Sequence, residues 1–346
     1  MPSPLNEQPA TPPTFVARWD LDKTYLRTEF DTFRDILRTA LEKPEEKRTV
    51  PGAATLLREL SAAGGEIHIL SGSPRQMRGR IEKKLLLDGA RFHSLTLKPN
   101  LSNLLRLRLR AMRDQLGYKL PALLTSRASM GGLRGPSGAA LPEVLLGDDA
   151  EADALVYSLY ADVSAGLVTD DLLVKIMRLS GSYEDHIEAA LASARAIDKQ
   201  PAVRRIFIHL DRQTPPSRFR RYGGRVVPFF NYLQPALVIA DDGLLPAAAV
   251  GRVASELVTA HRFDGDALAR SYVDLRKRGH VGGALEHQLT AMIDAADPAA
   301  RGALSDMAKV LPRMLAVLPP VEPPGAADVD YVAVVGQHDR RRRDRK

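Results

Sequence analysis

The segment FVARWDLDKTYL, residues 15–26, constrains this chain more than any other part of it. It predicts a short apolar strand that ends in Asp20 and Asp22, with Thr24 two residues later. Two carboxylates this close repel each other unless a cation or a shared proton lies between them. Carboxylate oxygens also suit a hard ion such as Mg²⁺, and a strand end with paired acids and a hydroxyl indicates phosphoryl chemistry with an aspartate nucleophile. The alternative is a solvated turn in which Asp22 caps the next segment, and this segment alone favours neither.

A second apolar run, EIHIL at residues 66–70, predicts a buried parallel strand. It leads into Ser71-Gly72-Ser73, with Pro74 in the first turn of a following helix. Hydroxyls and free backbone N–H groups at a helix N-terminus can bind a phosphate oxygen. Serine is also a common helix cap, so this motif by itself favours the cap.

A further strand, residues 143–146, leads into the acid-rich sequence GDDAEAD. Its carboxylates are Asp148, Asp149, Glu151 and Asp153. One or two acids are enough to stabilise a helix N-terminus, so their number favours a metal site at a second strand end.

The remaining patterns predict a strand over residues 91–97 that ends at Lys98, and a helix over 101–116 that Gly117 ends. Lys119 then precedes a short helix that begins at Pro121. Other segments predict a strand over 205–211 and helices over 29–42, from 51 onward, within 167–200, and over 246–260, 266–277, 284–296 and 299–317.

Composition narrows the function further. The 346 residues include no cysteine, which excludes disulfides, thiolate metal sites and thiol nucleophiles. With no signal-peptide pattern and no apolar run of membrane-spanning length, the sequence favours a cytoplasmic protein. Residues 1–14 are expected to be a disordered, proline-rich leader.

The net charge of +7 is concentrated at the C-terminus. Residues 339–346 hold five arginines and one lysine against two aspartates, a net +4 that leaves +3 for the rest of the chain. Residues 319–346 are therefore expected to be a linker and a mobile basic tail. Such a tail is usually solvated and could also contact an anionic membrane, with nucleic acid as a weaker alternative. The arginines at 106, 108, 110 and 113 are expected to be a solvated flank of a helix, because no aromatic residues are interleaved with them.

In chain order, the motifs DLDKT, LSGSP, a lysine before a helix and LLGDDAEAD resemble the four motifs of the haloacid dehalogenase superfamily of phosphatases. Within it, residues 15–240 look most like the phosphatidate phosphatase catalytic domain of the actin-patch-protein type. The resemblance implies an α/β, three-layer Rossmannoid core with a central parallel sheet. The short intervals between the motifs leave little room for a large cap domain, so the core is expected to be nearly capless. The interval at about 167–200 looks like a helical insertion, which is a departure from the family. The helical patterns after residue 240 indicate a helical appendage over 241–318.

The resemblance also implies roles for individual residues. Asp20 would be the nucleophile, Asp22 the general acid and base, Ser71 a phosphoryl ligand and Lys119 the charge-compensating lysine, with Lys98 as the alternative. Substrate-binding positions would be Thr24, Gly72, Ser73 and Lys98, and Mg²⁺ would be held by Asp20, Asp22, Asp148, Asp149 and Asp153.

The sequence departs from the closer family at Lys23, where that family usually has a further acid. The expected activity is Mg²⁺-dependent hydrolysis of a phosphomonoester, with a phosphatidate-type lipid phosphate favoured. The alternatives are a soluble phosphomonoester as substrate, or a module that binds phosphate or a membrane surface without catalysis.

Overall fold

The computed structural model describes residues 12–26, 48–98, 111–130, 134–135, 138–150 and 152–343. The helix predicted over residues 29–42 lies wholly outside them, as do the first eleven residues of the predicted leader. The predicted absence of a large cap depends partly on the segments 27–47 and 99–110, which also lie outside. Glu151 of the acid-rich motif is outside as well.

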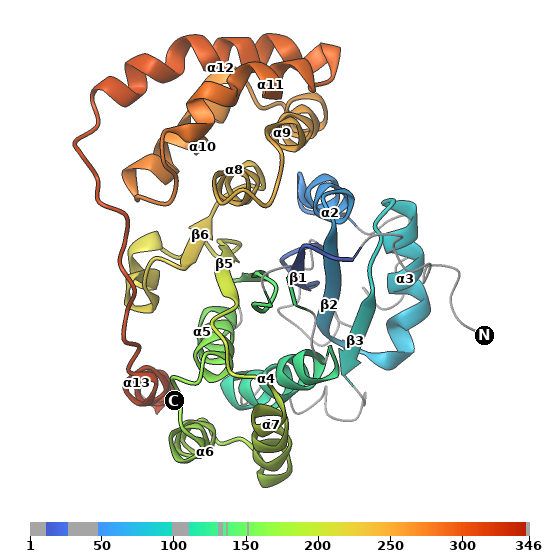
Figure 1. The fold of residues 1–346 in the computed structure, drawn as a ribbon, viewed down its shortest axis with the longest axis vertical. Helices are drawn as coiled ribbons and strands as arrows, with labels where there is room; N and C mark the ends of the chain where they lie inside the picture. The colour runs from blue at the N-terminus through green and yellow to red at the C-terminus, as the bar shows by residue number, and fades with distance from the viewer. Residues whose placement is uncertain are drawn as a thin grey trace.

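A six-stranded, all-parallel sheet forms the centre of the molecule (Figure 1). Its order is β3-β2-β1-β4-β5-β6, which is the order of Rossmann-like sheets. The strands are β1 (Phe15–Asp20), β2 (Gly65–Pro74), β3 (Ser94–Lys98), β4 (Glu143–Asp148), β5 (Val203–His209) and β6 (Val226–Phe229). The chain reverses its direction of winding between β1 and β4, and in such sheets ligands bind outside the carboxyl ends of the strands at this switch point.

Successive side chains of β1 point to opposite faces of the sheet, and a hydrophobic cluster lies on each face. Trp19 packs into one hydrophobic cluster, whereas the side chains at positions 18 and 20 point to the other face. The first cluster joins the sheet to α2 (Ala53–Ala62), α3 (Arg78–Leu87), α8 (Leu233–Asp241) and α9 (Ala247–His261). The second joins it to α4 (Ala111–Ser129), α5 (Asp153–Ser164), α6 (Asp170–Leu179) and α7 (Glu184–Ala196). Helices therefore cover both faces of the sheet.

The C-terminal helices predicted from sequence are present as α9, α10 (Gly265–Lys277), α11 (Leu289–Asp294) and α12 (Pro298–Ala316), with a 3-10 turn before α11. Residues of α10 and α12 belong to the same hydrophobic cluster as Trp19 of β1. This helical addition therefore continues the core of the sheet. Among the residues that the structure describes, no helix has both the length and the apolar character needed to cross a bilayer.

The prediction that Gly117 ends one helix and that another begins near Lys119 is wrong. One helix, α4, runs through both positions to Ser129 and contains Pro121. A Cβ at Gly117 would lie 2.6 Å from Nδ1 of His186 on α7. The glycine therefore allows two helices to approach each other, and tertiary packing overrides its weak helix propensity.

The LSGSP motif also differs from its prediction. Strand β2 continues through Pro74, which pairs with Lys98 after an irregularity in the ladder. A 3-10 turn (Arg75–Met77) follows, and α3 begins only at Arg78. Ser71 and Ser73 therefore lie on an extended strand end instead of at a helix N-terminus.

The predicted linker and tail, residues 319–346, contain a helix, α13 (Tyr331–Arg343). Tyr331 donates a hydrogen bond to Asp162, and Val334 and Val335 are buried in the second cluster next to α6. The segment just before the basic residues is thus docked on the core, a contact that the composition of the linker does not reveal. Residues 344–346 lie outside the description.

Candidate active site

Three aspartates meet at the carboxyl edge of the sheet. Asp20 ends β1, Asp148 ends β4 and Asp153 begins α5, and all three are buried. One carboxylate oxygen of each lies within 4.8 Å of those of the others. Asp153 approaches this closely because its Oδ2 accepts the backbone N–H of Asp148 at 3.1 Å and because Gly147 has no Cβ, which would collide with that carboxylate.

Lys119 lies between two of these acids. Its Nζ is 2.9 Å from Oδ1 of Asp20 and 2.5 Å from Oδ1 of Asp153, and its side chain is 0% exposed. A buried ammonium needs such partners because it has lost its hydration. Three carboxylates and one ammonium leave a net charge of −2 in this buried cluster if all are ionised.

The cluster fits a divalent cation by charge and by chemistry. Its donors are carboxylate oxygens, which hard ions such as Mg²⁺ prefer. A dication would balance the excess of two negative charges that Lys119 leaves. The residues that would hold it are Asp20, Asp148 and Asp153.

A second polar group lies beside the first. Oδ2 of Asp22 accepts hydrogen bonds from the hydroxyls of Ser71 at 3.0 Å and Ser73 at 3.1 Å. The Ser71 hydroxyl also accepts the backbone N–H of Ser73 at 3.0 Å. A Cβ at Gly72 would meet no atom within 4 Å, so the backbone between the two serines is open to a ligand. The motif from β2 thus orients Asp22 at the edge of open space.

The loop after β1 is held by residues that the sequence analysis did not identify. Lys23 adopts a left-handed backbone conformation with φ 58°, and its carbonyl lies 2.8 Å from Nδ1 of His209. Tyr232 donates a 2.5 Å hydrogen bond to the carbonyl of Thr24. The Thr24 hydroxyl lies 3.5 Å from Oδ2 of Asp20. His209 ends β5 on the same edge of the sheet, and that position was the only sequence signal for its role.

Two further residues predicted for the site, Asp149 and Lys98, lie outside the group of three aspartates. Asp149 accepts backbone N–H groups of Arg212 at 2.8 Å and Thr214 at 2.9 Å, so both of its oxygens hold the loop after β5. Of the two residues expected to assist Asp148, Asp153 is therefore the one that lies in the group of three aspartates. Lys98 ends β3, and its Nζ is 5.8 Å from the centre of the Tyr118 ring.

Tyr118 connects these parts of the site. Its hydroxyl donates to the carbonyl of Ser71 at 3.1 Å, and burial raises the pKa of Tyr118 well above its ordinary value. The phenol therefore stays a neutral donor. Of the two lysines considered from sequence, Lys119 is the one placed between Asp20 and Asp153.

Comparisons of the chain with protein-family models, with curated proteins and with solved structures found no match. The observations that bear on function are therefore those of the molecule itself. They are a parallel α/β sheet and a buried group of three aspartates, able to hold a metal ion, at the ends of its central strands.

Proposed function

We propose that this protein is a Mg²⁺-dependent phosphatase of the haloacid dehalogenase type, which hydrolyses a phosphomonoester through a phosphoaspartate on Asp20. The observation that carries the proposal is the buried Lys119, which bridges Asp20 and Asp153 beside Asp148 at the switch point of the sheet. A purely structural ion pair would not need a third acid, Asp148, beside the two that Lys119 contacts. Phosphoryl transfer requires a positioned nucleophile and compensation of charge, and both are supplied here.

In the proposed reaction, a carboxylate oxygen of Asp20 forms a bond to phosphorus, and the bond from phosphorus to the ester oxygen breaks. Asp22 gives its proton to the departing alkoxide. It then takes a proton from the water that attacks the phosphoaspartate, which releases inorganic phosphate and restores Asp20. Lys119 compensates negative charge on the phosphoryl oxygens and on Asp20, and the Ser71 hydroxyl donates a hydrogen bond to a phosphoryl oxygen. Mg²⁺, when bound, would supply further positive charge beside those oxygens.

The direct test replaces the nucleophile by its amide. Asp20→Asn should lower Mg²⁺-dependent release of phosphate by roughly 1,000-fold or more, because no carboxylate is left to form the bond and loss of a catalytic nucleophile can cost about 10⁶-fold in rate. The change keeps the volume of the side chain, so circular dichroism should stay unchanged. Asp171→Asn, an exposed position on α6, is the control and should retain full activity.

Activity of Asp20→Asn within a few-fold of the unaltered protein would exclude the phosphoaspartate mechanism. A protein that binds inorganic phosphate but hydrolyses no phosphomonoester, with or without Mg²⁺, would instead be a binding module. A module of that kind needs no nucleophile at the end of β1.

For the substrate we propose a phosphatidate-type lipid phosphate, on the resemblance of the four motifs and the basic residues 339–346. Each basic residue near an anionic bilayer contributes about 1 kcal/mol, and this attraction fades within a Debye length. Deleting residues 339–346 should therefore lower hydrolysis of phosphatidate in vesicles several-fold at low salt and leave hydrolysis of p-nitrophenyl phosphate unchanged. If the full chain ignores phosphatidate vesicles but cleaves p-nitrophenyl phosphate, the substrate is a soluble phosphomonoester.

A further inference from the structure

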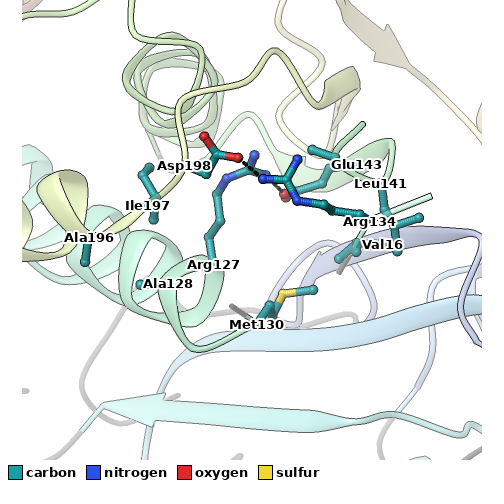
Figure 2. Close-up of a pocket in the computed structure, with 11 residues that line it drawn as sticks. Val16, Arg127, Ala128, Met130, Arg134, Leu141, Glu143, Ala196, Ile197 and Asp198 are labelled. Atoms are coloured by element: carbon teal, nitrogen blue, oxygen red, sulfur yellow. Dashed lines mark hydrogen bonds and ion pairs between the residues drawn. The ribbon is translucent and has the colours of Figure 1, made fainter. Parts of the chain in front are cut away.

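A cavity of about 420 Å³ opens at the amino-terminal edge of the sheet, opposite the three aspartates (Figure 2). Its wall includes the starts of β1 and β4, the end of α4, and the segment after α7. The size falls in the range of small-molecule pockets, roughly 300 to 1,000 Å³. Its lining residues are Val16, Arg127, Ala128, Met130, Arg134, Ala140, Leu141, Glu143, Ala196, Ile197 and Asp198.

One of the lining residues, Glu143, is a buried carboxylate with several partners. Glu143 is 2% exposed and accepts hydrogen bonds from Nε of Arg18 at 2.6 Å and from the Tyr160 hydroxyl at 2.8 Å. Nη1 of Arg127 contacts its other oxygen. Burial alone would raise the pKa of Glu143, but Arg18 and Arg127 hold it below its ordinary value. Both oxygens of Glu143 are therefore occupied within the protein.

Two guanidinium groups, Arg127 and Arg134, and two carboxylates, Glu143 and Asp198, line the cavity, so their formal charges balance. On its rim, Arg134 forms an ion pair with Asp198 and donates to the carbonyl of Gly138 at 2.6 Å. Glu143 is shared between Arg127 and Arg18, which is not part of the lining. Arg127 therefore has hydrogen-bonding capacity left for a bound group of negative charge.

Arg127 presents the binding edge for such a group. Among the residues that the structure describes, its partner is Glu143, reached through Nη1 alone, which leaves Nε and Nη2 on the other edge. Those two donors form the fork that binds a carboxylate or phosphate with two parallel hydrogen bonds. Figure 2 shows the guanidinium groups of Arg127 and Arg134 side by side above the apolar side chains. Val16, Leu141 and Ile197 supply apolar wall next to the fork.

We propose that this cavity is a second ligand site, which binds a small organic oxyanion: a carboxylate or phosphate group joined to a compact apolar portion. The head group pairs with Arg127 and Arg134, and the apolar portion contacts the wall. The site is separate from the acid cluster, because Arg127 is eight residues from Lys119 along α4, about 12 Å at the helical rise. The strand β1 separates the two sites in the same way, from Val16 at the cavity to Asp20.

The test is isothermal titration of the full chain, without divalent metal, with phenylphosphonate and separately with 4-phenylbutyrate. At least one probe should bind with a Kd below about 1 mM, and which one binds identifies the head group. Asp20→Asn should bind equally well. If neither probe binds, or if binding disappears in Asp20→Asn, the proposal is overturned.

Two variants locate the binding. Arg127→Lys keeps the charge and a partner for Glu143 but removes the fork, so it should weaken binding about tenfold or more. Ala196→Trp fills the mouth of the cavity from an exposed position and should weaken it comparably with the fold intact. Arg195→Gln, which removes an exposed ion pair with Asp170 outside the cavity, is the control and should bind like the unaltered chain. Unchanged affinity in both Arg127→Lys and Ala196→Trp would refute the site.

Discussion

The two edges of the central sheet carry buried charges of opposite balance. At the carboxyl edge, Lys119 is outnumbered by three aspartates, and the cluster needs added positive charge. At the amino edge, Glu143 is bound by Arg18 and Arg127, so the acid is the minority. The first arrangement suits a metal ion and turnover, because its charge is left incomplete. In the second arrangement both oxygens of Glu143 are already paired, and the ion pairs join β1, β4 and α4.

The largest expected difference between the edges is in stability. Glu143→Gln leaves the buried Arg18 without its counter-charge, and breaking a buried pair in this way costs about 3–5 kcal/mol in the free energy of unfolding. Urea denaturation measures it. Because Arg18 and Arg127 hold the folded-state pKa of Glu143 below its ordinary value, this stabilisation is present above that ordinary value and is lost as the pH falls through the folded pKa. The Gln variant should lack that part of the acid sensitivity, and a loss below 1 kcal/mol would contradict the assigned role.

The second prediction separates the two lysines of the carboxyl edge. Lys119→Ala should lower the rate of phosphate release roughly 100-fold or more, because it removes a charge partner of the nucleophile and of the phosphoryl group. Lys98→Ala should cost much less. Steady-state kinetics with p-nitrophenyl phosphate measures both, and the opposite ranking would transfer the role to Lys98.

The smallest expected effect is a gain in stability: removing a charge at the carboxyl edge should stabilise the protein, whereas removing one at the amino edge should destabilise it. Without metal, Asp148→Asn should raise the free energy of unfolding by about 1 kcal/mol, because it relieves repulsion among the carboxylates and can still accept the N–H of Ala150. Saturating Mg²⁺ should stabilise the unaltered protein by about 2 to 3 kcal/mol at a hundred times its Kd. Thermal denaturation with and without Mg²⁺ measures both. Equal stabilisation of Asp148→Asn by Mg²⁺ would place the ion elsewhere.

Local signals explain what the sequence predicted well. Asp20 and Asp148 each follow a short apolar run. A window of ten residues contains both the run and the acids after it, so each strand end can be predicted locally. The parallel sheet then follows from alternating strands and helices. The position of Lys119 beside these acids was also expected, although the helix that carries it was divided incorrectly.

Features that depend on distant partners were missed. Strand β6 was not predicted; it contains Pro228, which only an edge strand tolerates, and it is paired along one side by β5. Helix α13 docks through Tyr331, which is 169 residues from its partner Asp162. The pairing of Arg18 with Glu143 spans 125 residues and has no motif. Such contacts are set by topology, which no local pattern encodes.

The central place of β1 has a consequence for synthesis on the ribosome. Strand β1 leaves the ribosome before β4, which pairs along one of its sides and begins only at Glu143. At 5–20 residues per second, that side waits about 6 to 25 s without its neighbour. An unpaired apolar strand edge invites aggregation, and an inward-pointing charge discourages it. Arg18 supplies that charge on the nascent chain, and the arrival of Glu143 then neutralises it within the finished sheet.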